Sequence, residues 1–310
     1  MGEQWQRLKR KGDRIRLAAQ NRLHPGTIYF RSVVAPRILD RAPQPVAAEG
    51  EGPWEVHVLC GSQDVVSLFW SLHSLLAVCP DPPSLVVHDD GTLGDDWQGK
   101  LKAHFPGMRL VTRAEADARA EEVLKAWPKC HELRLNRRIA MKFFDYPVWA
   151  GQEWIGNVDS DILFFESPTD LIQWADREAP PRMGFHRDIF TTYGPLVKPL
   201  RKRDHDMPIR INSGLSMLHA PSLSLDRLEA WLEWPEVAAA VDAVGVGHLL
   251  GDQLLLALYS GAIETGFFTE DIGVPWQGAR PAVACHYTRA VRPLLYLHGI
   301  RRLQGSLLGG

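Results

Sequence analysis

One stretch constrains the fold of this chain most: residues 154–168 read WIGNVDSDILFFESP, where an apolar run stops at two carboxylates and then resumes. Apolar residues on both sides of the carboxylates are typical of an interior strand of a sheet. Residues two apart in an extended strand share a face, so we expect Asp159 and Asp161 to converge on one cation while Ser160 points away. Two carboxylates are costly to bury without a counter-charge, and a divalent metal that itself holds phosphates would supply one.

A second Asp-x-Asp copy is present, Asp204-His205-Asp206, because so short a pattern recurs by chance in a chain of 310 residues. It follows three consecutive basic residues, 201–203, and no apolar strand leads into it. Charge runs usually lie at the surface, so we interpret this copy as a solvated loop.

Composition narrows the class of protein. A hydrophobic content of 45% in 310 residues is ample for a core of one large or two small domains. The net charge of −2, with no basic patch interleaved with aromatic residues, argues against a dedicated nucleic-acid binder. Residues 1–40 nevertheless carry nine Lys or Arg against three Asp or Glu, which makes a basic arm. Such an arm could lie on an anionic membrane surface, contact another protein, or be a solvated helix.

Targeting signals and the spacing of the cysteines indicate the cellular compartment of the protein. The basic arm lacks the continuous apolar region of a signal peptide, and no stretch reaches the length of a membrane span. Cys60, Cys79, Cys130 and Cys285 are far apart and form no Cys-x-x-Cys pair, so we expect reduced, mostly buried thiols and no zinc site. We therefore expect a cytoplasmic protein, with peripheral contact at the inner membrane surface as an option for the arm.

The chain divides at a segment rich in proline and glycine, residues 41–53, which predicts a linker. We expect residues 1–50 to be the basic arm and linker and residues 51–310 to be one domain. In that domain, predicted strands at 54–60, 84–88 and 108–112 alternate with predicted helices at 65–78 and 95–104. Further on we expect a helix at 133–149, a strand at 210–219, and helices at 223–232 and 249–259. The alternation predicts an α/β fold with a mainly parallel sheet flanked by helices.

Open α/β sheets bind ligands beyond the carboxyl ends of their strands, so the turn at Asp89-Asp90 and the turn at Asp159–Asp161 are expected to line one crevice. An Asp-Asp-Gly turn also forms without any ligand.

Five features follow one another in a recognisable order. They are the acidic strand end at 86–91, Asp159-Ser160-Asp161, Asn212-Ser213-Gly214, Gly251-Asp252-Gln253 at a helix start, and His286-Tyr287-Thr288-Arg289 with Arg292. Together they resemble the nucleotide-sugar-dependent glycosyltransferases of the GT-A fold, most closely the family 8 branch of glycogenin-like and galactosyltransferase-like enzymes. The resemblance covers residues 54–299, and its specificity comes from the order of the motifs. It implies a GT-A, Rossmann-like mixed sheet.

The resemblance also implies a metal site. Asp159 and Asp161 would coordinate Mn²⁺ or Mg²⁺, and His286 would complete the protein ligands. Mixed carboxylate and imidazole ligation suits Mn²⁺ better than Mg²⁺. The cation would bridge the diphosphate of a UDP-sugar donor and stabilise the charge that grows on the leaving nucleoside diphosphate. Without the other motifs, a lone histidine beside apolar Ala284 and Cys285 would be interpreted as a core residue.

The resemblance assigns further contacts to the donor. Lys142, Arg289 and Arg292 would contact the diphosphate, and Asp89 or Asp90 would accept hydrogen bonds from the base or ribose. Each of these residues also has an ordinary surface or turn interpretation. The family's C-terminal H-x-x-G-x-x-K-P becomes HYTRAVRP here, which keeps the charge at Arg292 but changes the shape of the loop.

The resemblance assigns the catalytic positions too. Asn212 and Ser213 would orient the transferred sugar, and Gly214 would allow a backbone to approach the ligand closely. Asp252, beside Gln253, would lie near the reacting carbon or the acceptor hydroxyl, although Asp is also a common helix N-cap.

The sequence thus predicts a metal-dependent glycosyltransferase with an unknown glycan, lipid or protein acceptor, and the family favours retention of anomeric configuration. One alternative is a nucleotidyltransferase, although the loop at residues 61–64 is neither glycine-rich nor basic, as that class requires. A second alternative is a non-catalytic nucleotide-sugar-binding or scaffold protein with the same fold.

Overall fold

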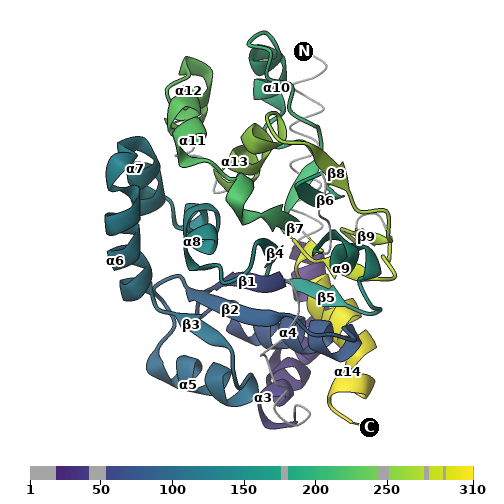
Figure 1. Cartoon of the computed structure of the whole chain (residues 1–310). Coiled ribbons are helices and arrows are strands. Elements are labelled where there is room, and N and C mark those ends of the chain that lie inside the picture. Colours follow the sequence, from purple (N-terminus) through teal and green to yellow (C-terminus); the bar gives the residue numbers. More distant parts are fainter. Residues whose placement is uncertain are drawn as a thin grey trace.

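A seven-stranded sheet forms the centre of the molecule, with helices on both of its faces (Figure 1). The computed structural model describes residues 19–41, 54–175, 181–242, 251–275, 279–288 and 291–309. The strand order is β3-β2-β1-β4-β7-β6-β8. Only β7 runs against its neighbours in this sheet, so the predicted mainly parallel α/β architecture is confirmed.

The strands of this sheet are β1 Trp54–Cys60, β2 Ser84–Asp89, β3 Arg109–Val111, β4 Trp154–Val158, β6 Met183–Arg187, β7 Ile211–His219 and β8 Thr265–Phe267. A second sheet has the order β5-β10-β9, with β5 Ile162–Phe164, β9 Ile272–Gly273 and β10 Ala284–His286. The longer helices are α4 Val65–Val78, α5 Asp95–His104, α6 Arg113–Val123, α7 Pro128–Asn136, α8 Met141–Trp149, α9 Thr169–Ala175, α10 Gly194–Arg201, α11 Leu225–Leu232, α12 Pro235–Asp242, α13 Gly251–Ser260 and α14 Arg301–Leu307. Short helical turns are η3 Leu124–Ala126, η4 Arg138–Ala140, η5 Ala220–Ser222 and η8 Leu295–Ile300.

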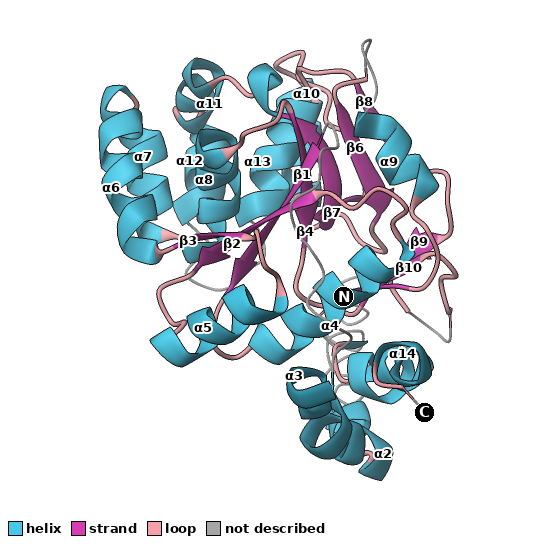
Figure 2. Ribbon diagram, turned by 60° about the horizontal axis from the view of Figure 1, so that its bottom comes forward, coloured by secondary structure: helices cyan, strands magenta, loops and turns pink. Residues whose placement is uncertain are grey.

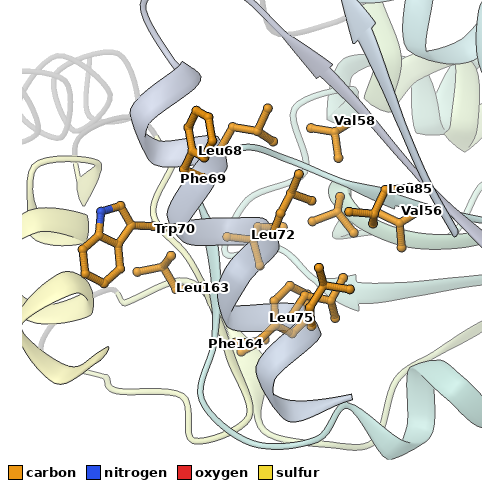
Figure 3. Close-up of a cluster of buried hydrophobic side chains, with 14 of the residues drawn as sticks. Val56, Val58, Leu68, Phe69, Trp70, Leu72, Leu75, Leu85, Leu163 and Phe164 are labelled. Atoms are coloured by element: carbon orange, nitrogen blue, oxygen red, sulfur yellow. The ribbon is translucent and has the colours of Figure 1, made fainter. Parts of the chain in front are cut away.

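Helix α4 is apolar nearly all round because it is enclosed by several elements. Leu72 and Leu75 face Val56 of β1 on one side, and β5 packs against the same helix (Figure 3). On a different side, the indole of Trp70 donates a hydrogen bond of 3.0 Å to the carbonyl of Ala35. This helix therefore joins the main sheet, the small sheet and the N-terminal segment in one core.

The N-terminal segment forms α2 Pro25–Tyr29, η1 Phe30–Val34, η2 Ala35–Arg37 and α3 Ile38–Arg41. Its inner side, including Val34 and Ile38, is buried in the core beside α4. Figure 2 shows α2, α3 and α14 together beyond α4, on the side away from the main sheet. Part of the predicted arm thus packs on the domain, and the predicted boundary at residue 50 lies outside the described residues.

Most predicted elements have the expected bounds. Residues 54–60, 65–78 and 95–104 match exactly, and the others mostly shift by one or two residues. The predicted single helix at 133–149 is wrong, because the backbone of Arg137 is extended (φ −131°, ψ 101°) and separates α7 from η4 and α8.

The predicted extended strand through the two carboxylates is also wrong. Strand β4 ends at Val158, and the amide of Ile162 donates to the carbonyl of Asp159 at 3.1 Å, which closes a turn. Strand β5 then joins the second sheet. The second Asp-x-Asp copy has its carboxylates exposed, as predicted for a loop.

The four cysteines are buried free thiols. Within the described residues, we find no helix with the length and apolar character that a bilayer crossing requires.

A buried ion pair joins α7 to α8. Arg134 is fully buried and donates from Nε and Nη2 to the two carboxylate oxygens of Asp145, at 2.9 and 2.8 Å. Lys142 also lies on α8, so the ion pair between Arg134 and Asp145 fixes the helix that places the Lys142 ammonium in the candidate site.

We expect Arg134→Leu to lower the free energy of unfolding by about 3–5 kcal/mol, because it leaves the buried carboxylate of Asp145 unpaired. Urea denaturation followed by circular dichroism measures the loss. Arg119→Leu is the matched control, since Arg119 forms only an exposed ion pair with Glu122, and we expect it to lose less than about 1 kcal/mol. Equal losses in the two variants would contradict this role of the buried pair.

Candidate active site

Three potential metal ligands meet where the two sheets join. Asp159 and Asp161 lie in the turn after β4, and His286 is the last residue of β10. Antiparallel pairing sets His286 opposite Ile162, and the amide of Tyr287 donates to the carbonyl of Asp161 at 2.9 Å. The Nε2 atom of His286 consequently lies 3.3 Å from Asp161 Oδ1 and 3.5 Å from Asp159 Oδ2.

The electrostatics of these three residues favour a cation. Their candidate ligand atoms all lie within 4.8 Å of one another. Burial alone would lower the pKa of His286, but Asp159 and Asp161 raise it to about 9. Burial alone would raise the pKa of Asp159, but the Lys142 ammonium and the His286 imidazole hold it well below its usual range. The buried Nε2 atom of His286 faces these two carboxylates but forms no well-aligned hydrogen bond with either. A donor set of two carboxylates and one imidazole fits Mn²⁺ or Mg²⁺.

Asn212 orients the imidazole. Its Oδ1 atom accepts from the Gly214 amide at 2.7 Å and lies 3.1 Å from His286 Nδ1. Donation from Nδ1–H to this oxygen makes Nε2 the nitrogen that faces the carboxylates, so a cation that displaced the Nε2 proton would find the arrangement usual behind a metal-binding histidine. A Cβ atom at Gly214 would collide with the His286 ring and lie 2.8 Å from Asp159 Oδ2. The close approach that Gly214 permits is therefore to the imidazole.

A residue that the sequence analysis did not identify holds Asn212 in place. Asp188 follows β6, is 5% exposed, and accepts from Asn212 Nδ2 at 3.0 Å and from Gln253 Nε2 at 2.9 Å. Thr192 donates to the amide oxygen of Gln253. The structure thus links Gln253, Asp188, Asn212 and His286 in one hydrogen-bonded chain. A single Asp after a strand is too common a signal to have been found by sequence.

Three other predicted site residues, Ser213, Asp252 and Arg289, are not shown to contact the candidate metal ligands. Neighbours on a strand point to opposite faces, so the side chain of Ser213 lies on the face opposite to that of Asn212. The carbonyl of Ser213 accepts from Asn157 Nδ2. Asp252 belongs to α13, but its side chain, like the whole of Arg289, lies outside the described residues.

A cleft of about 320 Å³ opens beside the metal candidates, at the carboxyl ends of β1, β2 and β4. Its charged lining residues are Asp64, Asp90, Asp159, Asp161, Arg138, Lys142 and Arg292. Asp64 and Arg138 were not among the predicted site residues, because both lie in segments interpreted as an ordinary turn and helix.

Each basic side chain that lines the cleft forms an ion pair with a carboxylate. Lys142 binds Asp159, and Arg138 binds Asp90 at 2.9 Å. Arg292 reaches two carboxylates, Asp64 at 2.7 Å and Asp161 at 3.4 Å. Of these three basic side chains, Lys142 and Arg292 contact the candidate metal ligands Asp159 and Asp161 themselves.

Asp89 is the last residue of β2 and Asp90 follows it, and of these two carboxylates only that of Asp90 faces the cleft. Asp90 lines it, whereas Asp89 Oδ1 accepts from the amides of Gly91, Thr92 and Leu93 at 2.7, 3.1 and 3.0 Å. Asp89 therefore stabilises its own turn.

Comparison with known proteins gives the fold. No protein-family model and no curated protein match the sequence. Mouse xyloside xylosyltransferase 1 matches with a TM-score of 0.51 and 13% identity, over 75% of this chain and 96% of that one. The galactosyltransferase LgtC, solved with donor and acceptor sugar analogues, matches with a TM-score of 0.46 and 15% identity, over 83% of this chain and 97% of that one. Core-mannan synthase A from Aspergillus fumigatus, solved with Mn and GDP, matches with a TM-score of 0.45 and 12% identity, over 74% and 75%.

The chain has the fold of the GT-A glycosyltransferases, and the resemblance stated from the sequence is confirmed at the level of the fold. At its centre, Asp159, Asp161 and His286 form a candidate metal site.

We expect Gly214→Ala to weaken Mn²⁺ binding by about tenfold or more, because the added methyl group displaces the His286 ring. Calorimetric titration of the nucleotide-free protein with Mn²⁺ measures the affinity. Gly99→Ala is the matched control, since nothing lies within 4 Å of a Cβ atom there, and we expect wild-type affinity. Wild-type Mn²⁺ affinity in a folded Gly214→Ala protein would show that His286 is not a ligand.

Proposed function

We propose that this protein is a metal-dependent glycosyltransferase that transfers a sugar from a nucleoside diphosphate donor, a UDP-sugar, to an acceptor hydroxyl. One observation carries the proposal: Asp159, Asp161 and His286 converge beside a charged cleft at the carboxyl ends of the strands. In open α/β sheets this is the usual position of a ligand site. A nucleotidyltransferase is less well supported, because the loop after β1 contributes the carboxylate of Asp64 to the cleft rather than phosphate-binding glycines and cations.

Asp159, Asp161 and His286 would hold the cation, Mn²⁺ in preference to Mg²⁺. When bound, it would supply the positive charge that offsets the growing charge of the leaving nucleoside diphosphate. Neutralising Asp159 and Asp161 would leave Lys142 and Arg292 available for phosphate oxygens. Lys142 acts as a point charge, whereas the guanidinium of Arg292 offers forked donors. We assign Arg289, on the same segment as Arg292, to the same diphosphate.

The remaining residues would position the donor and acceptor. Asp90, which lies in the cleft, would accept hydrogen bonds from the base or ribose, with Asp89 shaping the turn that carries it. Asn212 and Gln253 would act through the chain of hydrogen bonds behind His286. Ser213 would contribute to sugar orientation through its strand, and Asp252 is our candidate carboxylate near the reacting carbon. We propose retention of the anomeric configuration, and the ground for it is the family resemblance alone.

The four buried free thiols support a reducing compartment, and we place the protein in the cytoplasm. The acceptor is a hydroxyl of a glycan, lipid or protein.

We expect UDP to bind measurably only when Mn²⁺ is present, because the carboxylates around the cleft repel a diphosphate without it. Calorimetric titration of UDP with and without Mn²⁺ tests this. Asp161→Asn should abolish the metal-dependent binding. Asp206→Asn alters the exposed second Asp-x-Asp copy and should leave binding unchanged. Binding of UDP that is indifferent to Mn²⁺ would argue strongly against the proposal.

Slow hydrolysis of UDP-glucose or UDP-galactose separates an enzyme from a non-catalytic binder of the same fold. We expect the wild-type protein with Mn²⁺ to release UDP during long incubation, and Asp161→Asn to release none, because the leaving group then lacks its counter-charge. Chromatography of the nucleotide products measures this. A protein that binds UDP with Mn²⁺ and hydrolyses neither sugar nucleotide would favour the binder.

We expect Lys142→Gln to act in opposite directions on the two ligands. UDP binding in the presence of Mn²⁺ should weaken by about tenfold, because a charged contact to phosphate is lost. Mn²⁺ alone should bind at least as tightly as to the wild-type protein, because Asp159 loses the ammonium that competes for it. Lys100→Gln, at an exposed ion pair with Asp96, is the control. Weakening of both ligands would instead indicate damage to the turn.

A further inference from the structure

In the part of the chain that the structure describes, the exposed large apolar side chains are concentrated between residues 23 and 33. Among the described residues, the large apolar side chains that are exposed are Leu23 (71%), Ile28 (42%), Tyr29 (51%), Val33 (40%), Leu135 (48%) and Ile209 (55%). The first four fall within 11 consecutive residues, 23–33, and we call them the N-terminal apolar face. Single exposed apolar side chains are normal, but a cluster of them marks an interaction surface.

This face is held outward because the opposite side of the same helices is already packed. Thr27, Val34 and Ile38 are buried, and η1 and α2 both contact η8. A Cβ atom at Gly26 would lie only 2.7 Å from Leu297 Cδ1, so α2 lies tightly against η8. The helices are thus fixed on the domain by one side, and the apolar side chains on the other remain 40–71% exposed, although the ring of Tyr29 also packs edge-on against Phe30.

Positive charge surrounds the N-terminal apolar face. Arg22, Arg31 and Arg37 are exposed on the same segment, and none of them forms an ion pair with a described carboxylate. The preceding 18 residues add six Lys or Arg against two acidic residues. The chain as a whole has a net charge of −2, so this concentration of cations is local.

We propose that the N-terminal apolar face and its arginines dock the protein peripherally on an anionic lipid bilayer. Apolar side chains inserted at the level of the headgroups, with basic residues beside them, are the combination by which helices bind such a surface. Tyr29 suits this interface because its ring is apolar and its hydroxyl is polar. A symmetric contact between two copies would bring the same arginines together, and like charges across an interface oppose association.

Flotation of the full-length protein with lipid vesicles tests the proposal. We expect it to bind vesicles of phosphatidylcholine mixed with phosphatidylglycerol, to bind much less to phosphatidylcholine alone, and to be released by high salt. The triple variant Ile28→Ser, Tyr29→Ser, Val33→Ser should lose binding by about tenfold or more. The double variant Arg22→Glu, Arg31→Glu should do the same, because it reverses two positive charges and keeps the apolar side chains.

The matched control is the double variant Leu135→Ser, Ile209→Ser, which removes equally exposed apolar side chains from other parts of the surface and should bind as the wild type does. Undiminished vesicle binding by the triple variant would overturn the proposal, as would equal binding to neutral and anionic vesicles. A dimer in analytical ultracentrifugation that the triple variant abolishes would show instead that the face joins two copies.

Mn²⁺-dependent UDP binding in solution distinguishes this proposal from the function proposed above. The triple variant should retain it in full, since the substituted side chains lie outside the residues that line the cleft. Loss of UDP binding together with vesicle binding would show that the substitutions had damaged the domain, and the single variant Tyr29→Ser would then replace the triple variant in the flotation experiment. Undiminished flotation of that single variant alongside undiminished flotation of the arginine variant would overturn the proposal.

Discussion

The turn after β4 places the carboxylates of Asp159 and Asp161 together at the edge of the core, where nearby positive charge has to offset their repulsion. Lys142 from α8, His286 from β10 and Arg292 from the segment after β10 supply it. These elements come from distant parts of the chain, so this charge balance joins α8, β10 and the segment after β10 at one turn. A divalent cation would satisfy the same carboxylates and leave the basic side chains to an anionic ligand.

Precise placement of the imidazole comes from backbone pairing and from a second set of polar contacts. The pairing of β10 with β5 sets His286 beside the turn, and Gly214 leaves room for its ring. Asn212 fixes the ring nitrogen that faces away, and Asp188 fixes Asn212. The imidazole of this candidate metal site is thus held in place by contacts that need no ligand, which would suit the proposed binding of a diphosphate while a sugar departs.

Membrane docking and sugar transfer would use separate parts of the molecule. The cleft opens at the carboxyl ends of the central strands, whereas the N-terminal apolar face lies on helices beyond α4 (Figure 2). The connection between them is η8, which contacts η1 and begins three residues after Arg292. A lipid-bound protein would therefore keep its candidate active site free of the surface contact itself.

Local hydrophobic periodicity determined most of the elements, which is why the strand at 54–60 and the helices at 65–78 and 95–104 were predicted with exact bounds. The order of motifs also identified Asp159, Asp161 and His286 as one group. Tertiary structure alone decided that the carboxylates lie in a turn, that Asp188 supports the imidazole through Asn212, and that Asp64 faces the cleft. The physical reason is distance along the chain: Arg292 and Asp64, for example, are 228 residues apart, and no local pattern encodes a contact of that kind.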